Sequence, residues 1–516
     1  MSRYWMIRAL NGALCALCES EYRRFISLRG PKEAQEAKLS EILRKNSRSA
    51  YGMRHDFGSI RSIAEFQRRV PLTTYEDYAP YIRRIMQGEQ GVLTEERVLL
   101  LEPTGGSTSG AKLIPYTKSL QQEMQRGIRP WLYNLCSSYS GVKWGKSYWS
   151  VTPAASGRLR TEGGIPVGFE DDAAYFGRAE KLLLGQLFAV PQEISRESHI
   201  GRFYLHTALG LLKCPELSMI SVWNPTFLLL LLDYIHKNTD RLLSSLPPGR
   251  QADVSRYLPQ KRYEKLWPNL RVISCWCDAN ARPYARRLRQ LFPNVVIQPK
   301  GLLATECFVT FPLSGRKGGV LSVHSHFFEF KSADNGRIYL AHQLERGKTY
   351  EVIVTTGGGF YRYQMRDLIR ITGHTNGIPR MVFCGKSDRT SDLFGEKLDE
   401  VFVARVLRGC GLTGFALLAP ETDRYVLYAK GDALPAPDKL DQLLRKSFHY
   451  DYCRKLGQLK APRIFRITGE PEQEYFRRCA CRKQKLGDIK PALLTGYGGW
   501  ASWFTGYYAD APNPDR

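Results

Sequence analysis

A stretch of apolar runs and helical patterns between residues 218 and 298 decides the fold. Ser218-Met219-Ile220-Ser221-Val222, Leu270–Ser274 and Val295–Gln298 are apolar runs with the length of buried strands. Between them, Phe227–Asn238 and Ala281–Leu291 repeat apolar residues with the spacing of a helix. Strands that alternate with helices along the chain are typical of a sheet covered by helices, so we predict an α/β fold.

The same alternation continues toward the C-terminus and changes character after Phe383. Beyond this residue, loop-forming glycines and aspartates precede a set of shorter segments, which predicts a separate, smaller unit. We therefore expect a large N-terminal α/β domain with several sheets, residues 1–385, and a small C-terminal α+β domain, residues 401–516. The further segments behind this division are the expected strands Gly319–Val323, Ile338–Leu340, Tyr350–Thr355, Phe415–Leu418 and Tyr425–Ala429 and the expected helix Leu440–Phe448.

The charge of the chain is strongly positive. Its 75 Lys and Arg residues against 50 Asp and Glu residues give a formal net charge of +25, which is spread along the sequence. A field of this sign favours anionic partners, among them phosphorylated small molecules, nucleic acids and acidic lipid surfaces. Because the basic residues are not gathered into one tail, we do not expect nucleic-acid binding, and peripheral contact with an anionic membrane stays open.

Nothing in the sequence indicates a membrane span or a secretory signal. The longest purely apolar run, Phe227–Leu232, is far shorter than the roughly 20 residues of a membrane-spanning helix. Near the N-terminus Asn11 and Gly12 interrupt the apolar residues, and we interpret this segment as an amphipathic helix. The 12 cysteines lack the spacing of zinc ligands, so we expect reduced thiols in a cytoplasmic protein. The sequence gives no indication of the oligomeric state.

The first candidate site is the loop Thr104-Gly105-Gly106-Ser107-Thr108-Ser109-Gly110-Ala111-Lys112. It follows an expected strand, Val98–Leu101, and precedes a helix that we expect to begin near Lys118. Glycines permit a close approach of the backbone to a ligand, and the N–H and hydroxyl groups between them suit a polyphosphate. The spacing is not that of a Walker A loop. We predict a phosphate-binding loop in preference to an ordinary flexible surface loop.

The second candidate site is Gly301-Leu302-Leu303-Ala304-Thr305-Glu306, directly after an expected strand. Ligands of open α/β sheets bind at the carboxyl ends of the strands, where Thr305 and Glu306 are expected to lie. Glu306 can hold a magnesium ion, which prefers one or two carboxylates together with substrate phosphate oxygens. Taken alone, this motif is explained better by a solvated glutamate.

The third candidate site is Thr355-Thr356-Gly357-Gly358-Gly359-Phe360-Tyr361-Arg362-Tyr363-Gln364-Met365-Arg366-Asp367. A strand end runs into a triple-glycine turn, which is followed by aromatic, basic and acidic side chains. Asp367 can accept hydrogen bonds from both ribose hydroxyls while a tyrosine stacks on a base. An antiparallel strand with Arg362 and Arg366 in ion pairs with Asp367 and its neighbours explains the motif equally well.

In this order the three motifs resemble those of the acyl-adenylate-forming, firefly luciferase-like superfamily. More narrowly, the chain resembles the auxin-responsive Gretchen Hagen three family of acyl-acid amido synthetases, and within it a bacterial-type member. The likeness extends over almost the whole chain. The further stretches that carry it are Asp56-Phe57, Val70-Pro71-Leu72, Tyr75-Glu76-Asp77-Tyr78, Ser221–Thr226, Leu266–Leu270, Phe328-Glu329-Phe330, Tyr350-Glu351-Val352 and Gly395-Glu396-Lys397-Leu398.

The resemblance implies a role for individual residues. It places the ATP phosphates on the first loop, Mg²⁺ on Glu306 with the Thr305 hydroxyl beside the adenylate, and the ribose on Asp367. Lys490, in Gly487-Asp488-Ile489-Lys490-Pro491, matches the lysine that enters the active site during adenylation. The other residues that the resemblance implies at the nucleotide are Thr104, Gly106, Ser107, Thr108, Gly110, Thr117, Tyr361, Tyr363 and Lys386.

Some positions depart from the family pattern. Gly105 stands where the family usually has serine, and Lys112 follows Gly110 after one residue instead of two. Lys386 occupies a position that is usually arginine, so the bidentate geometry of a guanidinium toward ribose or phosphate is lost. Asp488 replaces a common glutamine.

The sequence therefore predicts an ATP- and Mg²⁺-dependent ligase. It adenylates a carboxylic acid and transfers the acyl group to an amine, in the first place an amino acid. The resemblance also implies that the small domain is mobile and rotates about a hinge at residues 386–400, so that one cleft serves both half-reactions. Two alternatives stay open: delivery of the acyl group to a thiol of coenzyme A or a carrier protein, and a non-catalytic basic protein that binds nucleic acid or membranes.

Overall fold

The computed structural model describes residues 2–103, 112–150, 160–168, 178–191, 193–194, 197, 199–387, 390–391, 393–394, 396, 398–455, 457–481, 489 and 491–509. The chain divides into two compact units. The large unit comprises Met1–Cys277, Ala285–Met365 and Ile369–Phe383. The small unit comprises Asp278–Tyr284, Arg366–Leu368 and Cys384–Arg516. Sheets and helices mix in both units, which confirms the predicted α/β class with a smaller C-terminal α+β part. The expected hinge at residues 386–400 stays a prediction.

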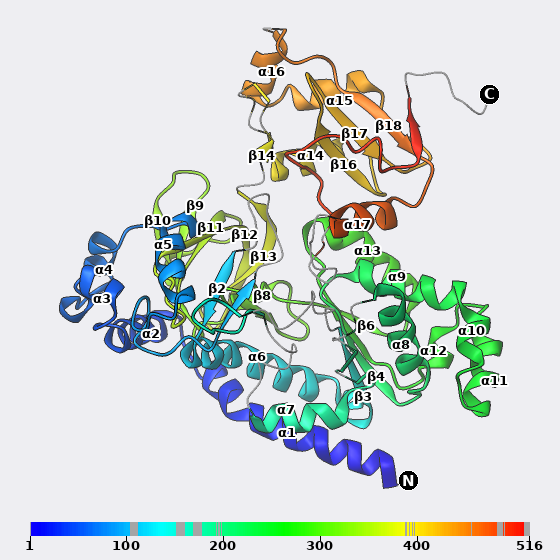
Figure 1. Cartoon of the computed structure of the whole chain (residues 1–516), viewed down its shortest axis with the longest axis horizontal. Coiled ribbons are helices and arrows are strands. Elements are labelled where there is room, and N and C mark those ends of the chain that lie inside the picture. Colours follow the sequence, from blue (N-terminus) through cyan, green and yellow to red (C-terminus); the bar gives the residue numbers. More distant parts are fainter. Residues whose placement is uncertain are drawn as a thin grey trace. The chain divides into compact units, whose positions relative to one another are not determined.

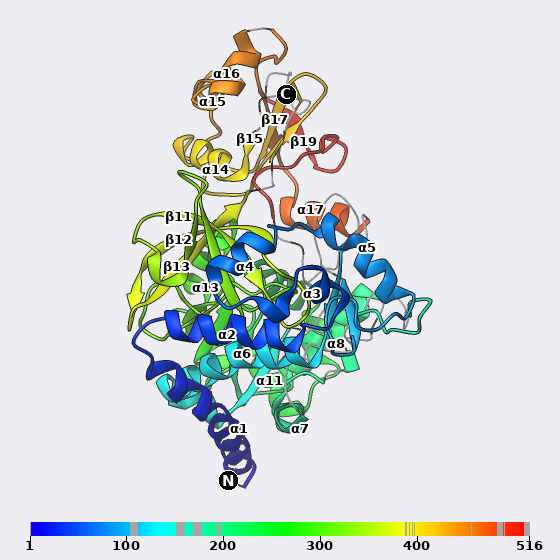
Figure 2. The same cartoon turned by 90° about the vertical axis from the view of Figure 1, so that its left-hand side faces the viewer.

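The large unit begins with a series of helices (Figures 1 and 2). The first helix, α1, packs against α6 and α7 and confirms the helix expected there. Side-chain caps mark the later starts: Ser62 Oγ accepts a hydrogen bond from Glu65 N, and Asp77 Oδ2 accepts one from Thr74 N, so the fifth helix begins at Tyr75. The bounds are α1 Ser2–Ile26, α2 Lys32–Lys45, α3 Ala50–Arg54, the 3₁₀ turn η1 Phe57–Ser59, α4 Ile63–Arg69 and α5 Tyr75–Met86.

A parallel sheet with the order β3-β4-β5-β6 lies in the middle of the large unit's sequence. The strands β4 and β5 are buried along their whole length, as expected of a parallel sheet covered on both faces. The predicted strands and helices between residues 218 and 298 are present, with ends displaced by at most a few residues. The bounds are β3 Lys146–Trp149, α7 Arg178–Leu187, α8 Ile200–Leu212, β4 Leu217–Ser221, α9 Pro225–Lys237, α10 Thr239–Leu243, α11 Pro248–Tyr257, α12 Tyr263–Leu266, β5 Val272–Cys275, η5 Ala279–Ala281, α13 Arg282–Leu291 and β6 Val296–Pro299.

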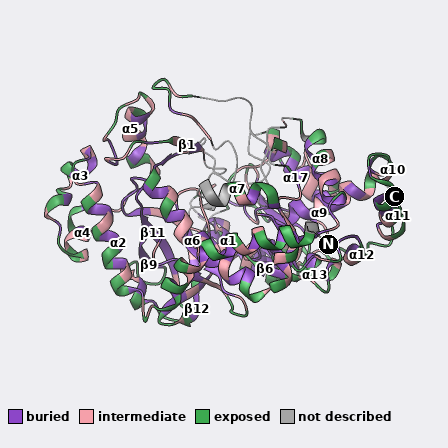
Figure 3. Cartoon of the chain, turned by 90° about the horizontal axis from the view of Figure 1, so that it is seen from below, coloured by how far each residue is buried: buried purple, intermediate pink, exposed green. Residues whose placement is uncertain are grey.

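The largest sheet among the described residues has seven strands in the order β10-β9-β11-β12-β13-β8-β7. Its inner strands β9 and β11 are drawn mainly in the colour of buried residues, whereas α1 is mainly exposed (Figure 3). Side chains of β12 alternate between buried and less buried positions, as the two faces of a strand require. The bounds are β7 Thr310–Pro312, β8 Gly319–Leu321, β9 Phe327–Ser332, β10 Ile338–Leu340, η6 Ala341–Gln343, β11 Thr349–Thr355, β12 Tyr363–Thr375 and β13 Ile378–Lys386.

Two short strands, β1 (Leu100–Pro103) and β2 (Leu113–Tyr116), precede the long helix α6 (Lys118–Ser138) and the 3₁₀ turn η2 (Ser140–Trp144). They pair antiparallel from Leu100 with Tyr116 to Pro103 with Leu113. The expected strand at Val98–Leu101 is thus displaced toward the C-terminus, because its partner strand sets the ladder. The helix expected to begin near Lys118 is confirmed as α6, and β2, which the sequence did not indicate, lies between the loop and this helix.

The small unit is built on the sheet β16-β17-β18-β19. One face packs on α14, α15 and α16 through Leu418, Leu427 and Ile464, and the other carries aromatic residues, among them Tyr428 and Phe465. Figure 2 shows these three helices gathered at one side of the sheet. The bounds are β14 Thr390–Ser391, β15 Leu398–Asp399, α14 Glu400–Gly409, β16 Ala416–Pro420, β17 Tyr425–Ala429, α15 Pro437–Leu444, α16 Phe448–Lys455, β18 Arg463–Ile467, α17 Pro471–Cys481 and β19 Gly506–Tyr508.

The helix expected at Leu440–Phe448 is wrong in its second half. The helix α15 ends at Leu444, and α16 begins at Phe448. Asp441 explains the break, because its carboxylate accepts hydrogen bonds from Arg445, Tyr450 and Arg454, and this arrangement folds the second helix back toward the first.

In the part of the chain that is described, none of the helices combines the length and the apolar character that crossing a lipid bilayer requires. The cysteines at all 12 positions are free thiols.

Candidate functional site

The structure describes the residues on either side of the first motif. Residues 104–111, which include Thr104, Gly106, Ser107, Thr108 and Gly110, lie outside the described residues. The pairing of Pro103 with Leu113 shows that the loop connects two neighbouring antiparallel strands. At its end the Lys112 Nζ atom lies 5.5 Å from the centre of the Tyr75 ring, and the Tyr75 hydroxyl accepts a hydrogen bond of 2.7 Å from Leu113 N. The start of α5 therefore fixes the C-terminal end of the loop.

Thr117 is the N-cap of α6 and is fully buried. Its Oγ1 atom accepts a hydrogen bond from Leu120 N (3.1 Å) and donates one to the Gly357 carbonyl (3.0 Å). A hydroxyl has a single hydrogen to donate, and here the third motif takes it. Thr117 thus connects α6 to the glycine turn, and the structure argues against its direct contact with the ATP phosphates.

The second motif forms a tight turn. Ala304 N donates to the Cys307 carbonyl at 3.0 Å, and Leu303 and Phe308 form an antiparallel bridge beneath it. Thr305 and Glu306 stand at the tip and are partly exposed. Glu306 lies near enough to Tyr75 to affect it: burial, followed by the negative charges of Glu76 and Glu306, raises the pKa of the Tyr75 hydroxyl. Glu306 and the end of the first motif therefore meet at Tyr75.

The aromatic part of the third motif is buried. The Tyr361 ring has no exposed surface, stacks on Tyr51 with 4.9 Å between ring centres, and its hydroxyl donates to the Leu93 carbonyl at 2.7 Å. Tyr363 is 4% exposed and stacks on Phe360. The prediction that these tyrosines contact the nucleotide is not supported by this geometry, because their rings are already enclosed by the core of the large unit.

One interpretation of the motif predicted an ion pair between Arg362 and Asp367, and the structure does not show this pair. Arg362 lies in the left-handed region with φ 49° and points into the large unit. Its Nε and Nη2 atoms bind the two carboxylate oxygens of Glu329 at 2.9 and 3.0 Å, and Nη1 donates to the carbonyls of Gln67 and Val70 at 2.8 Å each. The arginine of the motif therefore anchors the chain between the glycine turn and β12.

Two predicted nucleotide-binding residues do come together. Lys386 Nζ lies 3.0 Å from Asp367 Oδ1, and both residues belong to the small unit. The backbone supports the pair, because Ser387 N donates to the Arg366 carbonyl at 2.7 Å. Arg366 is itself left-handed, with φ 62°. The carboxylate assigned to the ribose thus has a lysine beside it that contributes one point charge.

Lys490 lies outside the described residues, but its neighbours place its segment on the small unit. Ile489 is buried, Leu493 N donates to Glu400 Oε1 at 3.0 Å, and Leu418 N donates to the Leu493 carbonyl at 2.8 Å. The chain that follows Lys490 is therefore anchored to α14 and to β16 of this unit.

Several residues that hold the motifs in place received no role from the sequence. The Tyr78 hydroxyl accepts from Tyr361 N (2.7 Å) and donates to the Tyr361 carbonyl (2.8 Å), and Thr73 Oγ1 donates to the same carbonyl (2.8 Å). Glu123 accepts a hydrogen bond from Gly357 N in the glycine turn, and His326 accepts one from Phe308 N beside the turn of Thr305 and Glu306. Glu123 and His326 are also hydrogen-bonded to each other. One signal was available for Glu123, since it is an acid within the apolar stripe of Leu120, Met124 and Ile128.

A carboxylate among the described residues suits a nucleotide-bound magnesium ion. Among them, no group of three or more His, Cys, Asp or Glu residues is arranged to hold a metal ion. Mg²⁺ is commonly bound by one or two carboxylates together with substrate phosphates. The partly exposed Glu306, close to the end of the glycine-rich loop, has the chemistry for this arrangement.

Comparison with known proteins agrees with this geometry. Residues 26–255 match the GH3 family N-terminal domain, and residues 319–386 match the GH3 family central domain. An indole-3-acetic acid-amido synthetase, GH3.2 of Arabidopsis thaliana, is 22% identical over 466 residues, which cover 79% of this chain and 83% of the relative. The jasmonoyl-L-amino acid synthetase GH3.5 of Oryza sativa subsp. japonica is 24% identical over 490 residues, 81% of this chain and 83% of the relative.

The solved structures give the same answer for the fold. The AtGH3.15 acyl acid amido synthetase in complex with 2,4-DB superposes with a TM-score of 0.81 at 18% sequence identity and covers 97% of this chain and 98% of its own. The resemblance to the Gretchen Hagen three family that the motifs indicated is thereby confirmed. The protein is a member of the GH3 family.

Proposed function

We propose that this protein is an ATP-dependent acyl-acid amido synthetase, which activates a carboxylic acid as its adenylate and transfers the acyl group to an amino acid. The observation that carries the proposal is the match to both GH3 domains, since these two matches contain the glycine-rich loop and the segment Tyr361–Asp367. The relatives support the amine acceptor over a thiol, because GH3.2 and the rice GH3.5 are both amido synthetases.

In the first half-reaction a carboxylate oxygen of the acid attacks the α-phosphorus of ATP. A new P–O bond forms, the bond from the α-phosphorus to the bridging oxygen breaks, and pyrophosphate leaves with the electron pair. Magnesium supplies the neutralising charge for the phosphates when it is bound. The donors of the first loop bind the phosphates, and Glu306 would hold the metal. Asp367 accepts hydrogen bonds from the ribose hydroxyls, and Lys490 stabilises charge at the α-phosphate.

In the second half-reaction the amine nitrogen attacks the acyl carbon of the mixed anhydride. A C–N bond forms, the C–O bond to phosphate breaks, AMP leaves, and the nitrogen loses a proton. A carboxylate alone is a poor electrophile, whereas AMP is a good leaving group, so binding energy spent on adenylation makes the amide possible. The hinge at residues 386–400 serves the exchange of Lys490 for the amine between the two steps.

The test is ATP–pyrophosphate exchange by the full chain with Mg²⁺ and a panel of aryl, indolyl and aliphatic carboxylic acids. Exchange that depends on one acid supports adenylation and names the substrate class. Amino acids and coenzyme A are then offered separately to the adenylate, and formation of an amide but no thioester supports the proposed acceptor. Absence of exchange with every acid, together with salt-sensitive binding to an anionic polymer or vesicle, contradicts the proposal and favours the non-catalytic alternative.

The variant Lys490→Ala separates the two half-reactions. Adenylation is expected to slow far more than amide formation from a supplied adenylate, because the lysine acts only in the first step. Lys455→Ala is the control, since this exposed lysine forms an ion pair with Asp451 within α16. Equal losses in both steps for Lys490→Ala contradict its assignment.

A cytoplasmic location goes with the proposal, because the reaction uses ATP and amino acids and the 12 cysteines are free thiols.

A further inference from the structure

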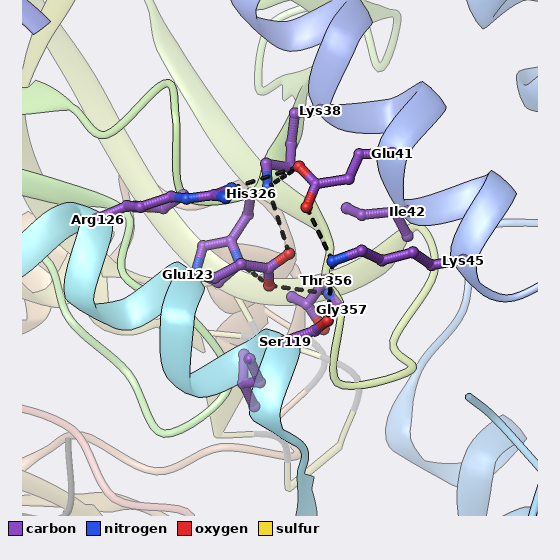
Figure 4. Close-up of polar contacts among 12 residues, drawn as sticks. Lys38, Glu41, Ile42, Lys45, Ser119, Glu123, Arg126, His326, Thr356 and Gly357 are labelled. Atoms are coloured by element: carbon purple, nitrogen blue, oxygen red, sulfur yellow. Dashed lines mark hydrogen bonds and ion pairs between the residues drawn. The ribbon is translucent and has the colours of Figure 1, made fainter. Parts of the chain in front are cut away.

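A buried carboxylate on α6 holds parts of two motifs at once (Figure 4). Glu123 is 3% exposed. Its Oε2 atom accepts a hydrogen bond from His326 Nδ1 at 2.9 Å and another from Gly357 N at 2.9 Å. Gly357 is the first residue of the triple-glycine turn, so this carboxylate fixes the start of the segment that leads to Asp367.

His326 carries the connection on to the second motif. It is fully buried, and its Nε2 atom accepts a hydrogen bond from Phe308 N at 3.0 Å. Because Nε2 is the acceptor, the proton must lie on Nδ1, which donates it to Glu123. Burial lowers the pKa of the imidazole, in keeping with this neutral form. Phe308 is the residue that closes the turn of Thr305 and Glu306 through its bridge with Leu303.

The charge of Glu123 is compensated from α2. Its Oε1 atom lies 3.8 Å from the Nζ atom of Lys38, which is buried and also contacts Glu41 at 2.8 Å. Lys45 and Arg126 complete the cluster by contacting Glu41 at 3.1 and 3.4 Å, as Figure 4 shows. The carboxylate of Glu123 is therefore buried and held in one orientation by His326, Gly357 and Lys38.

Close packing shows that both turns rest directly on α6. A Cβ atom on Gly357 would come within 2.8 Å of Ser119 Cβ and 2.9 Å of Glu123 Oε1, and a Cβ atom on Gly127 would come within 2.3 Å of the Phe308 ring. Thr117 holds the Gly357 carbonyl from the same helix. Displacing Glu123 or His326 must therefore shift a turn relative to α6, because the contacts at Gly357 and Gly127 leave no free space.

We propose that Glu123 and His326 are positioning residues for adenylation, which set the spacing between the Thr305-Glu306 turn and the triple-glycine turn. The inference deepens the proposed function and rests on it. Both side chains are buried, and neither is assigned a contact with the nucleotide. They act through the Phe308 and Gly357 amides, so their effect falls on the metal requirement and the rate of the first half-reaction rather than on affinity for the acid.

The experiment compares His326→Ala, His326→Gln, Glu123→Ala and Glu123→Gln in the full chain. Pyrophosphate exchange is measured at saturating ATP and acid while Mg²⁺ is titrated. His326→Ala is expected to reduce the exchange rate by about 10- to 100-fold and to raise the Mg²⁺ concentration for half-maximal rate, as is typical when a partner behind a metal ligand is lost. His326→Gln restores a donor and an acceptor and recovers part of the loss. Glu123→Gln keeps the oxygen acceptor without its charge and gives a smaller loss than His326→Ala.

Amide hydrogen exchange reports on the two turns and does not require enzyme activity. His326→Ala is expected to speed exchange of the Phe308 amide, and Glu123→Ala that of the Gly357 amide as well, while the rest of the large unit keeps its protection. His236→Gln is the matched control, because this histidine on α9 bonds the Tyr263 hydroxyl at 2.8 Å and holds neither turn.

The inference is overturned if the His326 and Glu123 variants keep the native rate and Mg²⁺ requirement. It is also overturned if they lose both half-reactions equally with protection lost throughout the large unit, because that is the mark of a purely structural role. If His326→Ala does not fold, His326→Gln and Glu123→Gln are judged by the same measurements of exchange rate, Mg²⁺ requirement and amide protection. If the native protein exchanges pyrophosphate with no acid, the proposed function fails, and the two amides still show whether the pair holds both turns.

Discussion

Arg362 and Asp367, five residues apart around the start of β12, form ion pairs of different character. Arg362 and Glu329 are buried in the large unit, with 7% and 1% of their side chains exposed, and form a bidentate contact. Lys386 and Asp367 belong to the small unit, form a single contact of 3.0 Å, and the lysine side chain is 38% exposed. The sequence presented both Arg362 and Asp367 as parts of one motif.

The difference supports the proposal that this motif has a structural half and a ligand-binding half. Four of the five N–H groups of the buried Arg362 guanidinium bind Glu329 and two backbone carbonyls, so the side chain is committed to the core of the large unit. Asp367 is also buried, at 4% exposed, and among the described residues its carboxylate pairs with the Lys386 ammonium group. A carboxylate accepts up to about four hydrogen bonds, which leaves capacity for ribose hydroxyls. Changes in the first pair should therefore reduce stability, and changes in the second should reduce nucleotide affinity.

The largest expected effect comes from breaking the buried pair. Arg362→Met leaves the Glu329 carboxylate buried without its cation and should lower the free energy of unfolding by about 3–5 kcal/mol. Urea unfolding followed by circular dichroism measures this loss. The double variant Arg362→Met, Glu329→Met is the control and should be less destabilised than the single variant, because no unpaired charge remains. A single variant as stable as the native protein would place Arg362 outside the structural half.

The next effect concerns ATP. Asp367→Ala removes an ionised acceptor for the ribose, and hydrogen bonds to charged groups contribute about 1.5–3 kcal/mol, so ATP affinity should fall by about 10- to 100-fold. Isothermal titration calorimetry measures it, with the thermal midpoint as a check on folding. Asp334→Ala is the matched control, since it removes an exposed aspartate that pairs with Lys348 at 3.3 Å. Unchanged ATP affinity in Asp367→Ala removes this residue from the ribose site.

A third expected effect is the pH dependence of stability in the part of the large unit that surrounds the structural half. His324 lies just before β9, the strand that carries Glu329, and burial, followed by the charges of Arg24, Arg126 and Lys38, lowers its pKa to about 4. In the unfolded chain a histidine binds a proton below about pH 6.5. Stability is therefore complete above this pH and is lost as the pH falls toward 4, by about 1–2 kcal/mol at pH 5.

Thermal melts of the native protein and of His324→Asn at pH 7 and pH 5 check this expectation. The variant lacks the titrating ring and should lose less stability on acidification. Parallel losses in the two proteins would assign the acid sensitivity to other groups, among them His326, whose pKa burial also lowers.

The fold was predictable wherever a strand or helix carries its own pattern. The strands around Ile220 and Ile273 and the helix from Pro225 are buried against neighbours of the same apolar kind, so local sequence and tertiary structure agree. The strand Leu113–Tyr116 was missed because it is short and its identity comes from pairing with Leu100–Pro103, which no local pattern displays. The break between α15 and α16 was missed for a similar reason, since the cause is a side-chain network around Asp441.

The candidate site was predictable as a set of motifs and less so as a set of contacts. The sequence predicted both members of the pair of Asp367 and Lys386, and it placed Glu306 on a turn. It could not show that Tyr361 and Arg362 point inward, because Arg362 has a positive φ and its partner Glu329 lies 33 residues earlier. Nor could it assign His326, whose tautomer depends on two partners from distant parts of the chain.

The smallest expected effect concerns the ion pair of Lys386 with Asp367, in the ligand-binding half of the motif. Lys386 stands where a superfamily arginine is usual, and its partly exposed ion pair with Asp367 contributes little to stability, about 0–1 kcal/mol. Lys386→Arg introduces a planar fork that can meet the Asp367 carboxylate in bidentate fashion. We expect an unchanged thermal midpoint and a change in ATP affinity smaller than that of Asp367→Ala.

Lys386→Ala separates the two ways in which this lysine can act. If it only orients Asp367, its removal should weaken ATP binding less than Asp367→Ala does, and the double variant should lose no more than Asp367→Ala alone, because the two residues then act through one contact. Additive losses in calorimetric titrations of the two single variants and the double variant would instead mean that the ammonium group binds the nucleotide independently, and the pair would then be two ligand-binding groups rather than a carboxylate with its support.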